Sequence, residues 1–154
     1  TVCINKKIHK EINGFNILVN NGEDLDFWIR IALNYKVAIS NKTTVFYNHM
    51  VENHSLSKLD IENRSLPDLD KYGTQEKLNS SLKDFLDLYR IEFALHFHIS
   101  GNQNKKKFYL KNVSPENICS KTKLLLKLPP VLLRKLLFFK RYLKQFGIDF
   151  SVYH

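Results

Sequence analysis

The feature that most limits the possible fold is a stretch of apolar residues at helical spacing, which runs from Gln75 to about Ser100. Large apolar side chains recur there every three or four residues, which places them on one broad face of a helix. The face consists of Leu78, Leu82, Phe85, Leu86, Leu88, Tyr89, Phe93 and Phe97. A face of this width predicts helices that pack against one another, so we expect this part of the chain to be all-helical.

The segments around this stretch continue the helical prediction. Residues 61–74 are polar and include a proline and a glycine, so we expect a linker or an irregular excursion there. Residues 101–107 are polar and lysine-rich, which predicts a turn. Residues 114–128 open with a Ser-Pro pair that is typical of a helix start, and residues 131–146 follow two prolines and predict a final helix.

The first sixty residues predict a different, mixed α/β structure. Residues 6–13 have helical spacing. A stronger helix is predicted to begin at Glu23, because apolar residues follow it at the i, i+3, i+4 and i+7 spacing of one face. Residues 37–39 and 43–47 are β-branched and aromatic, which predicts two short strands. We therefore expect an α/β fragment followed by an all-α tail.

The change of pattern near residue 60 predicts two domains, an α/β part over residues 1–60 and a helical extension over residues 61–154. A chain of 154 residues is long enough for one ordinary domain or two small ones. Cys3 and Cys119 are the only cysteines and lie far apart, which excludes a disulfide scaffold and favours a reducing, cytoplasmic compartment. The start shows no signal-peptide pattern and the sole methionine is Met50. Either an initiator methionine has been removed or, as we expect, the chain begins inside a larger protein.

Two adjacent carboxylates, Glu23 and Asp24, follow Gly22 at the start of the stronger predicted helix. A carboxylate at that position meets unpaired backbone N–H groups and the positive end of the helix dipole, which both favour its ionised form. An ionised carboxylate at a loop-to-helix junction can act as a general base toward a hydroxyl group. The alternative is an ordinary helix start, because acidic residues are common in first turns. The residues alone leave both interpretations open.

Residues 6–57, taken together, resemble the C-terminal part of the catalytic domain of family 2 inverting glycosyltransferases. The resemblance rests on the order and spacing of Ile12-Asn13-Gly14-Phe15, Gly22-Glu23-Asp24-Leu25-Asp26-Phe27-Trp28-Ile29-Arg30, Tyr35-Lys36-Val37-Ala38, and Tyr47 leading to Asn53-His54-Ser55. It covers about a third of the chain. It implies a fragment of a GT-A nucleotide-sugar transferase fold that holds the acceptor side of the active site without the donor side.

The resemblance also implies roles for single residues. Asp24 would be the general base that takes a proton from the acceptor hydroxyl, whose oxygen then attacks the anomeric carbon of a nucleotide sugar with inversion. Glu23 would position the acceptor or the base. Trp28 would either present its ring to a sugar or pack in the core, and Arg30 would be structural, through Asp26 or a neighbouring loop. The acceptor would be a glycan or a lipid-linked glycan of the cell envelope, at the inner face of the plasma membrane.

A divalent metal, Mg²⁺ or Mn²⁺, is the cofactor that the resemblance implies. A histidine after the last-strand tyrosine contributes to the metal–diphosphate site in many members of the family. Here Tyr47 is followed by His49, one position short of the usual spacing, and by His54, which comes too late. His49 is therefore the candidate metal ligand, and a solvated loop histidine is the alternative. The family's Asp-x-Asp motif is missing, so we expect an incomplete and inactive enzyme.

The basic tail predicts a function of another class. Lys plus Arg number 24 and Asp plus Glu number 15, a net charge of +9 that favours an anionic partner. The final predicted helix places Leu132, Leu136, Phe139, Leu143 and Phe146 near one face and its basic residues mostly elsewhere, which is typical of a helix in a membrane interface. A helix packed on its neighbour is the alternative. The aromatic residues fall at core spacing, which argues against nucleic acid. The second hypothesis is thus a non-catalytic helical module that binds a partner or an anionic membrane surface.

Overall fold

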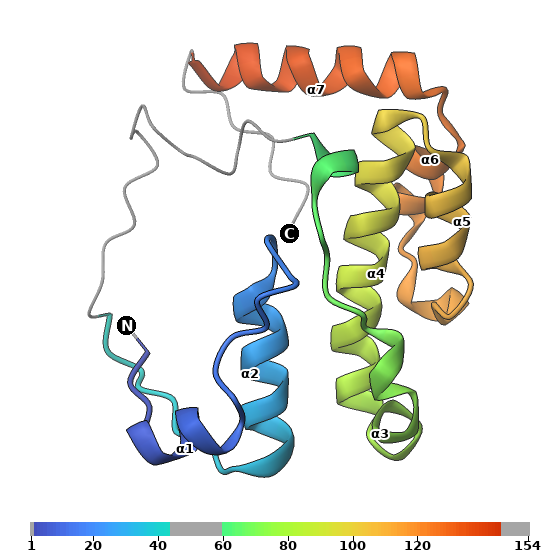
Figure 1. Ribbon diagram of the computed structural model, residues 1–154. Helices are drawn as coiled ribbons and strands as arrows, with labels where there is room; N and C mark the ends of the chain where they lie inside the picture. The colour runs from blue at the N-terminus through green and yellow to red at the C-terminus, as the bar shows by residue number, and fades with distance from the viewer. Residues whose placement is uncertain (1, 44–59, 146–154) are drawn as a thin grey trace. The chain divides into compact units, whose positions relative to one another are not determined.

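The computed structural model describes residues 2–43 and 60–145, and the chain divides into two compact units, Thr1–Asp68 and Leu69–His154 (Figure 1). All the regular elements in the described ranges are helices. The first unit contains α1 (Lys6–Glu11), α2 (Glu23–Asn34) and the 3₁₀ helix η1 (Ile61–Asn63). The second contains η2 (Asp70–Tyr72), α3 (Gly73–Leu78), α4 (Ser80–Ser100), α5 (Gln103–Leu110), η3 (Pro115–Asn117), α6 (Ser120–Lys127) and α7 (Pro130–Gln145).

The expected α/β fragment, and with it the resemblance to a GT-A glycosyltransferase, is wrong, because residues 2–43 and 60–145 contain no strand. Residues 37–39 have no regular structure, and Val37 and Ile39 are exposed at 61% and 89%. β-branched side chains favour an extended backbone, but a strand persists only beside a partner and with a buried face. The second expected strand falls outside the described residues except for Thr43. The expected all-α tail agrees with the structure.

The first unit is built around α2, which begins directly after Gly22, as the sequence predicts. Gly22 has a left-handed backbone with φ of 83°, and a Cβ there would approach Pro67 to 3.2 Å. The buried apolar side chains of α2 are Leu25, Phe27, Ile29 and Ile31. Phe27 is 1% exposed and stacks on Phe15 from the preceding loop, with ring centroids 4.3 Å apart. Aromatic stacking and apolar burial therefore hold this loop against α2.

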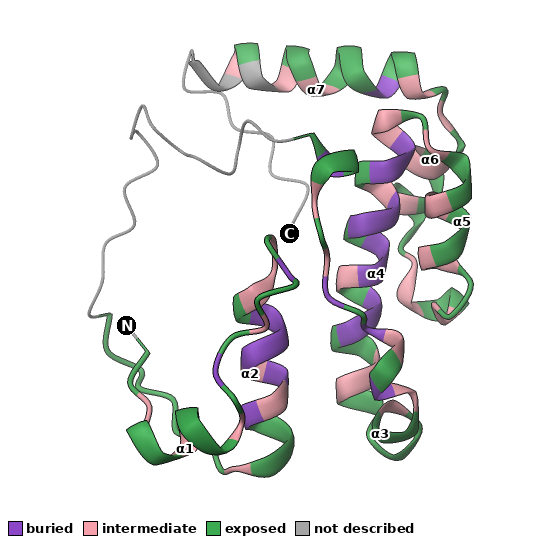
Figure 2. Ribbon diagram, in the orientation of Figure 1, coloured by how far each residue is buried: buried purple, intermediate pink, exposed green. Residues whose placement is uncertain are grey.

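The second unit is organised by α4, which contacts α3, α5, α6, α7 and η3. The purple positions in Figure 2 follow one side of α4, where Leu86, Ala94 and Phe97 are almost completely buried. The long predicted helix is interrupted once: α3 ends at Leu78, and the side chain of Asn79 caps α4 by accepting a hydrogen bond from the Leu82 N–H at 3.1 Å. Side-chain capping satisfies a backbone donor that the helix itself leaves unpaired.

Three local predictions in the helical part differ from the structure. The helix expected to start at the Ser114-Pro115 pair is only the 3₁₀ helix η3 there, and α6 begins at Ser120. Residues 61–74 were expected to be a linker or an irregular excursion, and residues 64–69 are irregular. The rest of this segment forms η1 and η2 and begins α3, and Ile61, Leu69 and Tyr72 are buried there. The predicted turn over residues 101–107 is much shorter than expected, since α5 already begins at Gln103. Its start is capped by Asn102, whose side chain accepts a hydrogen bond from the Lys105 N–H at 3.0 Å. Lysine is a good helix former, so a lysine-rich segment continues the helix once it is capped.

Candidate functional site

The predicted acidic pair, Glu23 and Asp24, lies in the first turn of α2. Asp24 is exposed, and its Oδ1 accepts a hydrogen bond from the backbone N–H of Leu25 at 2.7 Å. Glu23 is half-buried. Trp28 is also half-buried, and its ring meets Phe27 edge-on with centroids 4.9 Å apart. The first turn of α2 therefore holds an exposed carboxylate that binds its own helix end, which is what an ordinary helix start requires.

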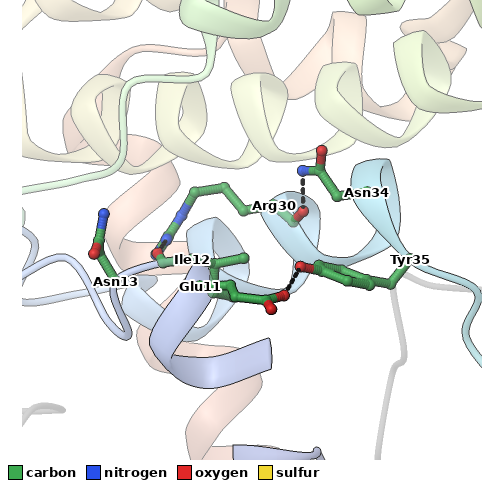
Figure 3. A pocket seen from close by; sticks show the side chains of 6 residues that line it. All are labelled: Glu11, Ile12, Asn13, Arg30, Asn34 and Tyr35. Atoms are coloured by element: carbon green, nitrogen blue, oxygen red, sulfur yellow. Dashed lines mark hydrogen bonds between the residues drawn. The ribbon is translucent and has the colours of Figure 1, made fainter. Parts of the chain in front are cut away.

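A pocket of about 420 Å³ lies between α1 and the other end of α2, and neither carboxylate nor Trp28 lines it (Figure 3). Its walls are formed by Glu11, Ile12, Asn13, Arg30, Asn34 and Tyr35. The Tyr35 hydroxyl donates to Glu11 Oε2 at 2.6 Å, and the Asn34 side-chain amide donates to the Arg30 carbonyl at 2.8 Å. The hydrogen bond to the Glu11 carboxylate raises the pKa of Tyr35 above its ordinary value near 10. These polar groups bind one another and connect α1 to the end of α2.

Arg30 has the structural role that the sequence predicts for it. Its Nε donates to Asp26 Oδ2 at 3.0 Å, and its other nitrogens donate to the carbonyl oxygens of Ile12 and, at 2.7 Å, of Gly14. Asp26 is only 1% exposed and the Arg30 side chain is 23% exposed, so this pair is partly buried rather than a surface pair. The guanidinium is therefore engaged in holding the loop between α1 and α2, where Asn13 and Gly14 have left-handed backbones.

The metal prediction concerns residues that the structure does not describe. His49 and His54 both lie outside the described ranges, so a ligand role for His49 stays a prediction of the sequence. Within residues 2–43 and 60–145, no three His, Cys, Asp or Glu side chains are grouped closely enough to hold a metal ion. The buried acidic residues there are engaged in ion pairs: Asp26 binds Arg30, and Asp87 binds Lys83 and Arg90.

The most extensive exposed apolar surface on one helix belongs to α7, which Figure 2 shows mainly in the colour for exposed residues. Its exposed large apolar side chains are Val131, Leu132, Leu136, Phe138, Phe139 and Tyr142. Phe138 is exposed at 75% and Phe139 at 56%. The sequence predicted the row that contains Leu132, Leu136 and Phe139. It did not predict Val131, Phe138 and Tyr142, because these lie on a second row of the helix.

The inner side of α7 is attached to the rest of the second unit. Leu133 is 3% exposed, and α7 contacts α4. The junction before α7 is held by His98 and Lys106, whose side chains bind the carbonyl oxygens of Leu128, at 2.8 Å, and Leu126, at 2.7 Å. Burial lowers the pKa of Lys106, and the nearby charge of Lys107 lowers it further. These bonds satisfy carbonyls at the carboxyl end of α6 and fix the point from which α7 starts.

The described parts of the chain contain no helix that is both long enough and apolar enough to cross a bilayer. The chain matches no model of a known protein family, no curated protein and no solved structure. The resemblance to family 2 glycosyltransferases therefore gains no support from these comparisons either. The functional interpretation rests on the exposed apolar surface of α7 and on the charges that surround it.

Proposed function

We propose that the helical unit Leu69–His154 is a non-catalytic module that attaches the chain to an anionic membrane surface. The observation that carries this proposal is the uneven distribution of charge. Residues 93–148 contain twelve Lys or Arg residues and a single acidic residue, Glu116. The rest of the chain contains twelve basic and fourteen acidic residues, so the positive charge of the protein originates in this one segment.

The helices of this segment present the positive charge to solvent. The exposed basic residues on α5, α6 and α7 include Lys107, Lys121, Lys123, Lys127, Arg134 and Lys135. A basic residue close to an anionic leaflet contributes about 1 kcal/mol to binding, and the attraction acts over about 10 Å at an ionic strength of 0.1 M. Several exposed cations on neighbouring helices therefore suffice for salt-sensitive attachment to an anionic surface.

The apolar residues on α7 favour a membrane over a nucleic acid as the anionic partner. A nucleic-acid interface places its cations on phosphates and its aromatic rings on bases, and exposed aliphatic residues such as Val131, Leu132 and Leu136 contribute little to either contact. A membrane interface binds cationic and apolar side chains alike, because it offers anionic headgroups beside an apolar layer. The resemblance that suggested a glycosyltransferase falls with the expected α/β fold, and no contact among the described residues supports that activity.

The proposal is tested by co-sedimentation of the full chain with vesicles of phosphatidylcholine, with and without phosphatidylserine. The triple variant Lys121→Gln, Lys123→Gln, Lys127→Gln removes three exposed charges from α6. We expect wild type to bind the anionic vesicles, and the triple variant to bind them at least about tenfold more weakly.

The matched control is Lys6→Gln, Lys7→Gln, Lys10→Gln, which removes three exposed charges from α1 in the other unit. It should keep most of the wild-type binding. Equal binding of wild type to neutral and anionic vesicles would contradict the proposal, and so would an equal loss in the two triple variants.

A further inference from the structure

The apolar side chains of α7 form two neighbouring rows that together face away from the protein core. Leu132, Leu136 and Phe139 follow the i, i+4, i+7 spacing of one row. The second row contains Val131, Phe138 and Tyr142 and lies about 100° further round the helix. The opposite side of α7 carries Leu133, the residue that is buried against the rest of the unit. The apolar rows are therefore additional to the surface that α7 needs for packing.

The charges on α7 have one sign but do not all lie outside the apolar rows. The helix carries five basic residues and no acidic one. Arg134 is exposed at the edge of the apolar rows, whereas Lys135 is exposed within the second row, four residues after Val131 and seven before Tyr142. The long stem of a lysine can lie along apolar surface while its ammonium group reaches the headgroups. A helix of sixteen residues is about 24 Å long, so α7 is too short and too charged to cross a bilayer but suits its surface.

We infer that α7 lies flat in the boundary between headgroups and acyl chains of an anionic bilayer, with Phe138 and Phe139 inserted among the chains. The inference rests on the proposed function and names the part of the module that enters the lipid. The exposed lysines of α5 and α6 attract the unit to the anionic surface, and the two rows of α7 then leave water. Binding accordingly has a salt-sensitive electrostatic part and a salt-resistant apolar part.

Charge complementarity selects a membrane rather than a second copy of the chain as the occupant of this face. Two copies of α7 packed through these rows would bring their Lys135 side chains together, with no acidic residue on either helix to balance them. Like charges at such close range repel, whereas an anionic leaflet neutralises them. Large apolar patches rimmed by cations are typical of surfaces that bind membranes.

Insertion is measured with a fluorescent reporter. Trp28 is the only tryptophan of the chain and lies in the other unit, so Trp28→Phe provides a background without tryptophan. Phe139→Trp in this background then reports on α7 alone. With anionic vesicles, we expect a blue shift of its emission and strong quenching by lipids brominated on the acyl chains. A matched reporter, Phe85→Trp on α4, should show neither effect.

The contribution of the apolar side chains to vesicle binding is measured with the double variant Phe138→Ser, Phe139→Ser. The matched control is Phe85→Ser, Leu88→Ser, which alters two exposed apolar residues of α4. At raised salt, where electrostatic attraction is screened, we expect the α7 variant to bind anionic vesicles at least about tenfold more weakly than wild type. The α4 control should bind like wild type. Circular dichroism should show that both variants keep the helical fold.

The outcomes separate this inference from the proposed function. If binding depends on the α6 lysines but the reporter on α7 stays unquenched and the serine variant binds normally, insertion is wrong while electrostatic attachment stands. If the chain binds no anionic vesicle at all, both are wrong. If sedimentation equilibrium shows a dimer in the absence of lipid and Phe138→Ser, Phe139→Ser abolishes it, the face is an interface between two copies, which overturns insertion.

Discussion

In each unit, an arginine forms the centre of a polar cluster that connects separate segments of the chain. Arg30 binds Asp26 and two loop carbonyls in the first unit. Arg90, which is 1% exposed, binds Asp70, Glu76 and Asp87 in the second. Arginine suits such positions because its guanidinium group presents five donors in a fixed plane and stays charged when buried.

Asp87 binds four partners among the described residues of the second unit. It accepts hydrogen bonds from Lys83, from the Ser114 N–H at 2.9 Å and from Asn117 at 2.9 Å, and it also binds Arg90. Burial on its own would raise the pKa of Asp87, but the hydrogen bonds from Lys83, Ser114 and Asn117 lower it below the ordinary 3.8. Asp70 has a lowered pKa as well: burial on its own would raise it, but hydrogen bonds from Asn112 and Arg90 lower it below 3.8.

We therefore predict that the second unit loses stability in acid. A carboxylate whose pKa is lower in the folded state stabilises the fold above the pKa of the unfolded chain, and this stabilisation is lost as the pH falls below about 4. Asp87→Asn should lower the free energy of unfolding by about 3 kcal/mol at neutral pH, because it leaves Lys83 and Arg90 without their shared partner. It should also flatten the acid dependence. Urea unfolding at several pH values measures both, and an unchanged acid dependence in Asp87→Asn would contradict the assignment.

At the same scale, the sequence predicted some contacts and missed others for physical reasons. The structural role expected for Arg30 is present in the structure, and its i, i+4 spacing from Asp26 accounts for their ion pair. The bonds of Arg90 to Asp70 and Glu76 join residues 20 and 14 positions apart, which come together because α3 packs on α4 and contacts η2. A periodic pattern contains no information about such contacts.

At the scale of elements, helices with a strong apolar period were predicted well. The helix from Glu23, the long helix through Ser100 and the final helix all exist, with bounds that differ by one or two residues except at Asn79. The strand over residues 37–39 was predicted wrongly, because β-propensity expresses a fit to a sheet that this part of the chain does not supply. α5 was missed because three consecutive lysines were interpreted as a turn.

Two glycines at helix ends provide a matched test of these assignments. Gly101 follows α4 with φ of 98°, and its N–H bonds back to the carbonyls of Phe97 and His98. Gly73 begins α3 with an ordinary helical φ of −57°. Neither position has an atom within 4 Å of an added Cβ, so the backbone alone decides the effect of a substitution.

We predict that Gly101→Ala lowers the free energy of unfolding by about 1 kcal/mol, since alanine disfavours a left-handed backbone. Gly73→Ala should leave the stability unchanged or raise it by up to about 1 kcal/mol, because alanine restricts the unfolded chain more than glycine does. Chemical denaturation of the two variants beside wild type measures the difference. Equal destabilisation by both substitutions would show that the end of α4 is assigned incorrectly.

At the scale of the whole molecule, the two units differ in charge and in the surface that they present. The basic residues concentrate on α5, α6 and α7, and the largest set of exposed apolar side chains on one helix lies on α7. The sequence of the tail already indicates that basic and apolar side chains occur together in these helices. The sequence alone did not show that α7 keeps Phe138 and Tyr142 in solvent, because exposure depends on which side of the helix meets α4.

The most direct test of the central claim is a titration of the full chain with vesicles in which the fraction of phosphatidylserine rises from zero. If the helical unit docks through its cations, the bound fraction should climb steeply with the anionic lipid, and added salt should shift the whole curve toward higher phosphatidylserine. A bound fraction that stays flat across the series, at low salt and with the chain folded, would contradict attachment to an anionic membrane.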